Sequence, residues 1–404
     1  MHILHLTRSI DPLGGCEIYL KNLISTFLSY GHRQSVITAV KPAESIPNDT
    51  TVHTINYLAN LDYREARLAV NPLAARVDEI KPDLIHIHDL NNPFIIEAAR
   101  QSKPTIKTTL NADAYCGGID KYLNRSEKEC CFKMGLGCIL VAYAEKCMSR
   151  HPRRNIEIIK LKKKSLELMN HIAKVIVPSE SSKQIMIQNG VKSSQIAAIP
   201  LFAGFAHQPI LKVKEPSPPE ILFLGRLRRY KGVHFLLQAT AALKQPYRLI
   251  VLGDGEEKSK LMAQAEKLGI RHCCRFLGNL PHDEVLPYLD RCRVVVVPSI
   301  YPDSFPTAGL EAMSRKKPVI GFDVGGISGW LKDGLTGYLV PTQNVGILTT
   351  NLDYLLANHE QACILGENGY RFFQDHFTAK RHYQTLLALY DDALTNSSKI
   401  STGV

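Results

Sequence analysis

Residues 293–313 read RVVVVPSIYPDSFPTAGLEAM, and this stretch decides the fold. The four valines Val294–Val297 are typical of a central parallel strand that is buried on both faces. The loop after them carries Asp303, and a helix is expected to follow with Glu311 about one turn inside it. A buried strand, a loop and a helix in this order predict an α/β domain with a parallel sheet.

The rest of the second half repeats this alternation. Amphipathic segments such as His234–Leu243 and Lys258–Leu268 separate the expected strands. The last helices are expected between Asn344 and Leu394, beyond the last strand signal. The strands are predicted at Ile221–Leu224, Tyr247–Leu252, Cys274–Leu277, Arg293–Val297 and Pro318–Phe322.

The first half follows the same pattern. An amphipathic helix after the first strand is expected to end before Gly31, which suits a C-terminal capping position. Ala203–Pro219 is rich in proline and lacks periodicity, which favours a linker. The strands are predicted at Ile3–Leu6, Ser35–Val40, Leu84–His88, Thr105–Leu110 and Lys174–Val177.

These patterns predict two Rossmann-like domains whose parallel sheets face each other across a cleft, with ligands at the carboxyl ends of the strands. The N-terminal domain is expected to cover residues 1–205, and the C-terminal helix, about 378–404, to pack back on it. The second domain is expected to cover residues 206–377.

The amino-acid composition of the chain excludes several classes of protein. The 404 residues include 45% hydrophobic and 22% charged residues, which excludes a disordered or fibrous protein. The net charge of +11 favours an anionic partner. A single tryptophan and the absence of RGG- or RNP-like runs argue against nucleic acid. Without a signal peptide or a long apolar run, we expect a cytoplasmic protein with reduced cysteines.

A basic loop follows the first strand of the second half. It reads GRLRRYKG over residues 225–232. Gly225 permits close approach of a ligand to the backbone, while Arg226 and Lys231 offer a forked donor and a point charge for phosphate oxygens. Taken alone, a phosphate-binding loop and a basic surface turn are about equally favoured.

Two further strand ends carry glycine. Gly253 stands in a Gly-Asp-Gly turn, and Gly278 is followed by Asn279 and Leu280. These turns can present backbone groups to a nucleotide, although tight strand-to-helix turns explain them as well.

Asp303 and Glu311 frame a helix start. Between them, the backbone N–H groups of Thr307 and Ala308 can point at an anion. Carboxylates beside a phosphate site suit the hydroxyls of a ribose and a sugar ring. The alternative is an acid that merely complements the helix dipole.

The ordered set of motifs resembles retaining GT-B glycosyltransferases of the group 1, or family 4, type, which build bacterial polysaccharides and glycolipids. The order and rough spacing are kept from about residue 1 to 395. The matching motifs are Gly14-Gly15-Cys16-Glu17, Pro82–His88, Val177–Glu180, Gly225-Arg226-Leu227 with Lys231-Gly232, Asp303-x7-Glu311, and Pro318-Val319-Ile320 through Gly325-Gly326 to Asp333–Gly337.

The resemblance implies roles for individual residues. Arg226 and Lys231 would hold the diphosphate of a nucleotide-sugar donor, which is expected to be a UDP-sugar, and Glu311 would bind the ribose hydroxyls. Asp303 would touch the donor sugar. The remaining implied donor contacts are the backbone groups of Gly14, Gly15, Gly225, Gly253, Gly278, Asn279, Leu280, Thr307 and Ala308.

The sequence departs from the family pattern at four places. Asp303 replaces a glutamate, Pro306 replaces a glycine, and Gly329 stands where a glutamate often follows the Gly-Gly turn. Asn111 replaces the histidine that contacts the donor sugar, and Asp113 is a possible substitute for it. We therefore group Asn111 with Arg226, Lys231 and Asp303 as the candidate catalytic residues.

The resemblance also implies the chemistry. No carboxylate is placed as a nucleophile, which favours front-face attack with the leaving phosphate as base. No metal and no cofactor are expected. The expected acceptor is a glycan or a lipid-linked sugar in surface polysaccharide or glycolipid synthesis. The alternatives are a transferase for a small soluble acceptor and a degenerate, non-catalytic sugar-nucleotide binder.

Two further features lie in the first half. Cys116, Cys130, Cys131, Cys138 and Cys147 crowd into one segment, but no C-x2-C pair occurs, so reduced buried thiols are favoured over a zinc site. The following basic stretch, residues 150–164, is either a solvated helix face or a contact with anionic lipid. The second reading would place the protein at the inner face of the cell membrane. His86 and His88 share a strand face and are expected to be structural.

Overall fold

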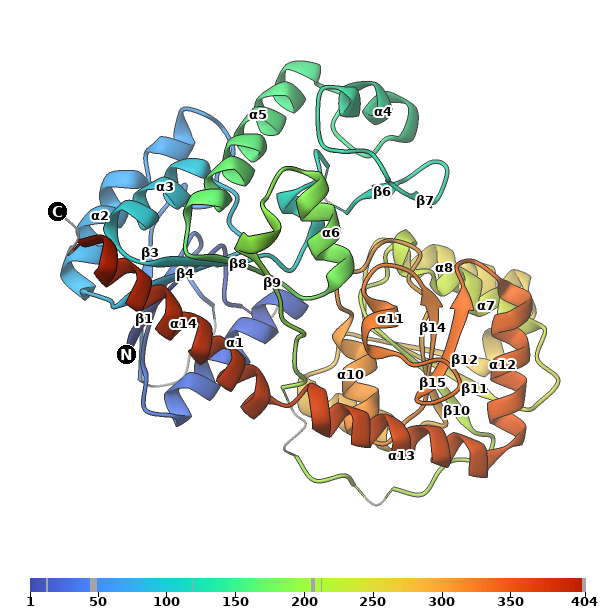
Figure 1. The fold of residues 1–404 in the computed structure, drawn as a ribbon. Coiled ribbons are helices and arrows are strands. Elements are labelled where there is room, and N and C mark those ends of the chain that lie inside the picture. Colours follow the sequence, from blue (N-terminus) through green and yellow to red (C-terminus); the bar gives the residue numbers. More distant parts are fainter. Residues whose placement is uncertain (12–13, 44–48, 119, 205–207, 212, 402–404) are drawn as a thin grey trace. The chain divides into compact units, whose positions relative to one another are not determined.

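The computed structural model describes residues 1–11, 14–43, 49–118, 120–204, 208–211 and 213–401. Internal contacts divide the chain into two units (Figure 1). Unit 1 comprises Met1–Gly204 and Ala379–Val404, and unit 2 comprises Phe205–Thr378. Each unit is an α/β fold with its own parallel sheet, so the predicted fold class is confirmed for both halves.

The sheet of unit 1 has seven parallel strands in the order β3-β2-β1-β4-β5-β8-β9. Its inner strands are almost completely buried, which explains their apolar composition. The strands are β1 His2–Thr7, β2 Arg33–Thr38, β3 Thr50–Thr54, β4 Leu84–His88, β5 Thr105–Thr108, β8 Lys174–Val177 and β9 Ile196–Ala198.

Helices cover both faces of this sheet (Figure 1). Helices α2, α3 and α5 pack in series on one face, and α1 packs against α14 on the other. Gly31 follows α1 with a φ of 81°, as expected for a capping glycine. The helices are α1 Gly15–Ser29, α2 Val70–Ile80, α3 Pro93–Ser102, α4 Gly137–Glu145, α5 Pro152–Leu168, α6 Glu180–Gln188 and α14 Ala379–Ser401, with 3-10 turns at Glu65–Arg67, Ala112–Ala114, Met169–His171 and Ser193–Gln195.

The last helix, α14, is tied to unit 1 by buried aromatic and imidazole groups. The Tyr19 hydroxyl lies 2.8 Å from Nε2 of His382, whose Nδ1 lies 2.8 Å from the carbonyl oxygen of Pro200. The Tyr390 hydroxyl lies 2.6 Å from Nδ1 of His86 on β4. These contacts explain why a segment so late in the chain belongs to the first unit.

The sheet of unit 2 has six parallel strands in the order β12-β11-β10-β13-β14-β15. The valine run forms the buried strand β13 beside β10, as predicted. The strands are β10 Glu220–Leu224, β11 Arg248–Leu252, β12 Cys274–Gly278, β13 Val294–Val297, β14 Val319–Asp323 and β15 Gly337–Pro341.

In unit 2, helix α7 packs against both α8 and α12, and α10 packs against α13. Among the described residues no helix combines the length and the apolar character needed to cross a membrane. The helices are α7 Val233–Ala241, α8 Lys258–Lys267, α9 His282–Arg291, α10 Thr307–Ser314, α11 Ile327–Trp330, α12 Val345–Ala357 and α13 His359–His376, with 3-10 turns at Arg229–Lys231 and Arg271–Cys273.

The sequence patterns missed three strands of the two large sheets, β3, β9 and β15, and all three lie at sheet edges. They also missed the short antiparallel pair β6 Tyr122–Leu123 and β7 Lys128–Glu129. Strand β3 is polar and half-exposed, and β9 has only three residues. Strand β15 begins with a glycine and ends with a proline, both of which read as loop signals. An edge strand tolerates such residues because the backbone groups along one of its sides are not hydrogen-bonded to a neighbouring strand.

Candidate functional site

The candidate site of unit 2 lies where the strand order reverses, between β10 and β13. Ligands of open α/β sheets bind at the carboxyl ends of the strands at such a point. The loops after these two strands pack together: the Ile300 N–H donates to the carbonyl oxygen of Tyr230 at 2.9 Å. A Cβ on Gly232 would lie 1.8 Å from the carbonyl oxygen of Pro298, so only glycine fits there.

Lys231 and Asp303 meet at this point. Nζ of Lys231 lies 2.5 Å from Oδ2 of Asp303, and the Ser299 hydroxyl lies 3.4 Å from the same oxygen. The Lys231 ammonium also stands 5.1 Å from the centre of the Tyr301 ring. Arg226 is exposed, and within the described part of the chain it has no ion-pair partner. Lys231 is thus an oriented cation, and Arg226 is a cation available to a ligand.

Helix α10 supplies backbone donors and a second carboxyl group. The helix begins after Pro306 without a side-chain cap, so the amides of Thr307 and Ala308 have no partner within the helix. One turn later stands the half-buried Glu311. Burial raises the pKa of Glu311 to about 7, although a hydrogen bond from the Thr307 side chain opposes the shift.

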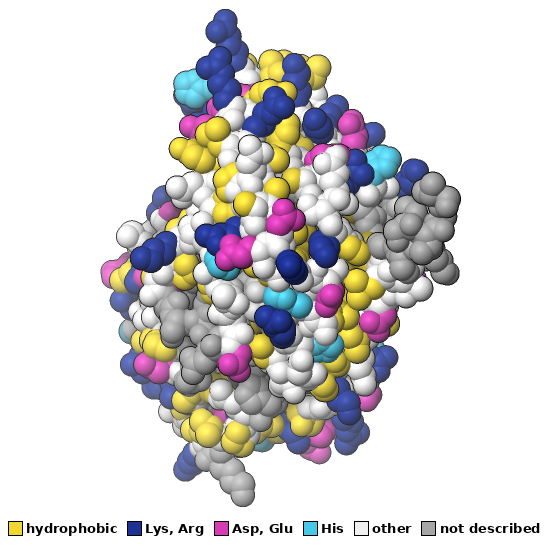
Figure 2. Space-filling view, turned by 90° about the vertical axis from the view of Figure 1, so that its left-hand side faces the viewer, with side chains coloured by type: hydrophobic (Ala, Val, Ile, Leu, Met, Phe, Trp, Pro, Cys, Tyr) yellow, Lys and Arg dark blue, Asp and Glu magenta, His cyan; other side chains and the backbone are white. Residues whose placement is uncertain are grey.

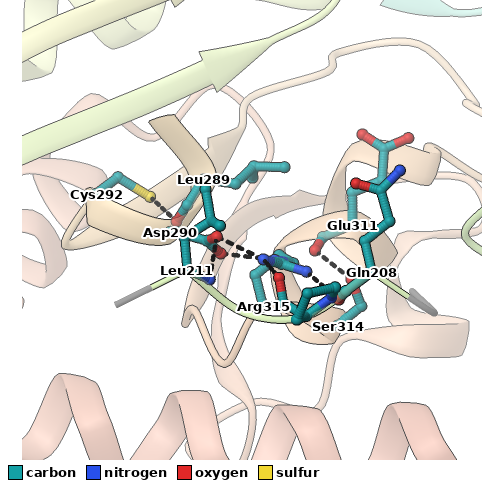
Figure 3. Close-up of polar contacts among 9 residues, drawn as sticks. Gln208, Leu211, Leu289, Asp290, Cys292, Glu311, Ser314 and Arg315 are labelled. Carbon is teal, nitrogen blue, oxygen red and sulfur yellow. Dashed lines mark hydrogen bonds and ion pairs between the residues drawn. The ribbon is translucent and has the colours of Figure 1, made fainter. Parts of the chain in front are cut away.

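The far end of α10 is anchored by a buried ion pair (Figure 3). Arg315 and Asp290 form two hydrogen bonds of 2.6 and 2.5 Å, and both side chains are fully buried. The Arg315 guanidinium also donates to the carbonyl oxygens of Gln208 and Pro209 at 2.7 and 2.8 Å. Figure 3 shows the Glu311 carboxylate pointing away from this pair, so the anchor fixes the helix and leaves the carboxylate uninvolved.

The glycine turns have a structural reason of their own. Gly253, with a φ of 129°, donates to the carbonyl oxygen of Gly278 at 2.8 Å. A Cβ on it would lie 1.9 Å from the carbonyl oxygen of Gly225. Close packing of loops therefore accounts for these three glycines, and their contact with a donor stays a prediction. Asn279 is exposed and Leu280 half-buried beside them.

The sequence reasoning missed a tryptophan beneath α10. Trp330, which is fully buried, lies so close to Gly309 that a Cβ there would come within 2.0 Å of its ring. The Gly325-Gly326 turn holds the other side of the loop, because the Gly326 N–H donates to the carbonyl oxygen of Asp303 at 2.8 Å. Tryptophan at 330 was visible in the sequence, but nothing there linked it to Gly309.

Unit 1 has a corresponding cluster at the carboxyl end of β4. The Asn111 side chain donates to Sγ of Cys16 at 3.3 Å, next to Gly14 and Gly15 at the start of α1. Asp89 accepts from the Leu110 N–H at 2.8 Å and from the Asn111 N–H at 3.4 Å.

Burial raises the pKa of Asp89 to about 6, opposed chiefly by the nearby Lys107. The sequence reasoning missed Asp89. Its position directly after the buried strand Leu84–His88 was the available signal.

Asp113 is already engaged. Its carboxylate pairs with Nζ of the buried Lys162 and accepts from the Asn91 side chain at 2.8 Å. A carboxylate held in this way is a weak substitute for the histidine that Asn111 replaces.

The histidines on β4 are buried beside polar groups of unit 1, and their structural role stays a prediction. His86 is bonded to the Tyr390 hydroxyl and, at 2.7 Å, to the Thr108 hydroxyl, and His88 lies 2.9 Å from His5. Burial lowers the pKa of His86 and of His88, so both rings are neutral near pH 7.

Comparison with family models settles the family. The model described as glycosyl transferases group 1 matches residues 209–372, and the model described as glycosyltransferase family 4 matches residues 13–202. The chain belongs to the group 1 glycosyltransferases. Both halves match in the order expected from the motifs.

Curated relatives include other glycosyltransferases. A D-inositol 3-phosphate glycosyltransferase of Corynebacterium urealyticum is 34% identical over 161 residues, which cover 37% of this chain and 38% of that protein. A glycogen synthase of Mycobacterium tuberculosis is 27% identical over 264 residues, or 64% of this chain and 56% of that protein. The chain therefore spans about two fifths to three fifths of the length of these relatives.

Solved structures share the GT-B fold over almost the whole chain. Sucrose-phosphate synthase from Thermosynechococcus elongatus has a TM-score of 0.74 at 20% identity, covering 98% of this chain and all of that one. Anabaena Alr3699/HepE in complex with UDP and glucose has a TM-score of 0.68 at 20% identity, covering 96% of this chain and 98% of that one. At these identities the likeness establishes the fold alone.

Proposed function

We propose that this protein transfers a hexosyl group from a nucleotide diphosphate sugar, uridine-linked, to a glycan or lipid-linked acceptor with retention of configuration. One observation carries the proposal. At the switch point of unit 2, an ion-paired Lys231 and an exposed Arg226 stand beside the loop that leads to the uncapped start of α10.

The roles follow from the chemistry of the groups. Arg226 and Lys231 hold the diphosphate, the amides of Thr307 and Ala308 cap a phosphate oxygen, and Glu311 accepts hydrogen bonds from the ribose hydroxyls. In unit 1, Gly14 and Gly15 offer backbone groups to the donor and Asn111 hydrogen-bonds the donor sugar. Asp303 keeps Lys231 in position in addition to contacting the sugar.

The uridine assignment draws on structural neighbours. Anabaena HepE was solved with UDP-glucose, and the TarM protein of S. aureus was solved with UDP. These ligands belong to those proteins, and they make uridine nucleotides the first donors to test for this chain.

The proposed reaction is a front-face displacement. The bond between the anomeric carbon and the diphosphate oxygen breaks, and the acceptor oxygen bonds to the same face of that carbon. The acceptor proton passes to the departing diphosphate. Arg226 and Lys231 stabilise the negative charge that develops on it, which is the part that a metal ion plays in other transferases. Catalysis is accordingly proposed to proceed without a metal.

A membrane-bound acceptor is supported by the surface around α4. Phe132, Leu136, Leu140 and Tyr143 are exposed there, Leu140 by 78% and Leu136 by 63%. Residues 116–164 contain twelve Lys and Arg against five Asp and Glu, or seven of the eleven net positive charges of the chain. Figure 2 shows basic and hydrophobic side chains together at the top of the view.

Helix α5 contributes only its charged residues to this surface. It buries Ile159, Leu161 and Leu166 within unit 1, while Arg153, Arg154, Lys160, Lys163 and Lys164 are exposed. The basic stretch is therefore a solvated face that can attract anionic lipid, and the apolar contact would come from α4. Co-sedimentation with vesicles containing an anionic lipid tests this contact. Binding that disappears at high salt supports it, and equal binding to neutral vesicles argues against it.

Release of nucleoside diphosphate from a panel of UDP-, GDP- and ADP-sugars tests the activity itself, with and without a chelator. We expect turnover with one nucleotide class, unaffected by the chelator, and a product of retained anomeric configuration by NMR. Arg226→Ala should lower turnover strongly, while Arg275→Ala, which removes an exposed charge on β12, should not. Full turnover by Arg226→Ala would contradict the mechanism. Nucleotide binding without any turnover would favour the non-catalytic binder.

A further inference from the structure

Asp89 has an unusual backbone conformation at the carboxyl end of β4. It follows His88 directly and adopts a φ of 50°, in the left-handed region that few residues other than glycine occupy. Of the non-glycine residues with a positive φ in the described part of the chain, only Asp89 directly follows a strand. Such conformations cost free energy, persist only where neighbouring groups hold them, and are concentrated at functional sites.

Neighbouring groups hold Asp89 through both its backbone and its side chain. Its N–H donates to the carbonyl oxygen of Thr108 on β5 at 3.1 Å. Its Oδ1 atom accepts from the Leu110 N–H at 2.8 Å and from the Asn111 N–H at 3.4 Å. These two amides belong to the segment that follows β5, whose last residue, Thr108, pairs with His88. The carboxylate therefore joins the ends of two neighbouring strands.

The first turn of α1 is the third segment that meets at this point. The Asn111 side chain donates to Sγ of Cys16 at 3.3 Å, and the Cys16 thiol is hydrogen-bonded to the Asp89 carboxylate as well. Asn111 is thus held twice, by its backbone N–H on Asp89 and by its side chain on Cys16. Asn111 is exposed and Asp89 is only half-buried, so a ligand can reach both residues.

The groups around Asp89 leave its carboxylate ionised near pH 7. Lys107 on β5 is fully buried, its ammonium donates to the carbonyl oxygen of Leu90 at 2.6 Å, and its charge opposes the rise in the pKa of Asp89 that burial causes. From α1, Cys16 and Tyr19 lie near the carboxylate, and burial raises the pKa of both groups, so both stay neutral. An ionised carboxylate is the stronger acceptor for the two amides.

We propose that Asp89 is a positioning residue, whose carboxylate holds the backbone of Leu110 and Asn111 and thereby sets where the Asn111 amide meets the donor sugar. The inference rests on the proposed function, because the contact between Asn111 and the donor sugar belongs to it. The amide of asparagine carries no charge and binds through directional hydrogen bonds. A displacement of about 1 Å at a reacting centre can cost about 100-fold in rate, so the segment after β5 needs a fixed position.

The carboxylate of Asp89 can be removed without straining the backbone. Glycine adopts a positive φ freely, so Asp89→Gly loses the carboxylate and suits the conformation that the chain already has. Asp89→Asn keeps the size of the side chain and an oxygen that can accept from the amides, but it loses the charge. Asp83→Ala is the matched control, because the Asp83 carboxylate also accepts a backbone N–H, from His2 at 2.7 Å, just before the amino end of β4.

Hydrogen–deuterium exchange of the full-length protein, resolved to single amides by mass spectrometry, tests the contact directly. In Asp89→Gly we expect the amides of Leu110 and Asn111 to exchange at least about tenfold faster than in the wild type, because their acceptor is lost. The amides within β4 and β5 should keep their wild-type rates, since the sheet is intact. Asp83→Ala should leave the exchange of Leu110 and Asn111 unchanged. This measurement needs no turnover.

Transfer kinetics test whether the contact matters for the reaction. Asp89→Gly should lower kcat by at least about tenfold with little change in the KM for the donor, because the proposed diphosphate and ribose contacts of unit 2 remain. Asp89→Asn should lie between Asp89→Gly and the wild type, because it keeps an acceptor for the amides. In the Asn111→Ala background, Asp89→Gly should lower kcat no further, since a residue that acts through the Asn111 amide has no effect once that amide is absent.

The outcomes separate this inference from the proposed function. Unchanged exchange of Leu110 and Asn111 in Asp89→Gly would overturn the positioning role, whether or not the protein is active. An equal fall in kcat with and without the Asn111 side chain would overturn it too, because Asp89 would then act on the substrate itself. Faster exchange together with a wild type that turns over no nucleotide sugar would confirm the hold of Asp89 on this segment and contradict the proposed function instead.

Discussion

Glu311 gives a prediction that links the pKa of one carboxyl group to donor binding. The ionised carboxylate accepts hydrogen bonds from both ribose hydroxyls, and the protonated form accepts them poorly. Burial raises the pKa of this group to about 7 in the free protein. A donor that needs the ionised form should therefore bind more tightly as the pH rises from 6 to 8.

The magnitude follows from the titration. With a pKa of about 7, roughly one eleventh of the carboxyl groups are ionised at pH 6 and about ten elevenths at pH 8. If only the ionised form binds, the apparent affinity rises about tenfold, or about 1.4 kcal/mol. Glu311→Gln removes this dependence and weakens binding at pH 8.

Isothermal titration calorimetry with UDP-glucose at pH 6, 7 and 8 measures the effect. A nucleotide sugar is preferable to free UDP, because its diphosphate has no terminal group that titrates in this range. Glu360→Gln, which alters an exposed carboxylate on α13, should behave as the wild type does. Equal affinities at pH 6 and pH 8, or a pH dependence that survives in Glu311→Gln, would refute the reasoning.

The same group also affects the free energy of unfolding. Because the folded-state pKa is raised above the ordinary value of 4.5, the folded protein binds more protons than the unfolded chain between about pH 4.5 and 7. The contribution of Glu311 to stability therefore falls as the pH rises through this range. Glu311→Gln should raise the melting midpoint of the ligand-free protein at pH 8 while weakening donor binding.

Two further predictions concern the support of α10. Gly309→Ala should destabilise the protein by about 1–3 kcal/mol in urea unfolding, because its Cβ would lie 2.0 Å from the ring of Trp330. The control is Gly329→Ala, whose Cβ would meet no atom within 4 Å, and this variant should change stability by less than about 0.5 kcal/mol. Arg315→Ala leaves a buried carboxylate unpaired and should cost about 3–5 kcal/mol, while Lys316→Ala, which breaks an exposed pair, should cost at most about 1 kcal/mol. Equal losses within either pair of variants would contradict the assigned packing.

The inner strands were predictable because burial on both faces gives them continuous runs of apolar residues. The ends of Leu84–His88 and Lys174–Val177 agree with the expected ones residue for residue. The edge strands were not predictable, since β3 is polar and β15 contains glycine and proline. An edge strand pairs with another strand along one side only, so its residue composition is less restricted than that of an inner strand.

The candidate site was predictable in its residues but not in its contacts. Lys231 and Asp303 lie 72 positions apart in the chain and meet at the switch point, and no local sequence pattern predicts their ion pair. The same holds for Asp89 beside Asn111. Side chains that meet only in the folded protein leave no regular spacing in the sequence.

Binding of a nucleotide to unit 2 is the central claim, and thermal unfolding with UDP, GDP and ADP tests it most directly. A ligand at 100 times its Kd stabilises the fold by about 2.7 kcal/mol, which is readily measured. We predict that UDP alone raises the melting midpoint, and that Lys231→Ala loses this rise. A midpoint unchanged by every nucleotide, or a rise of equal size in Lys231→Ala, would contradict the account.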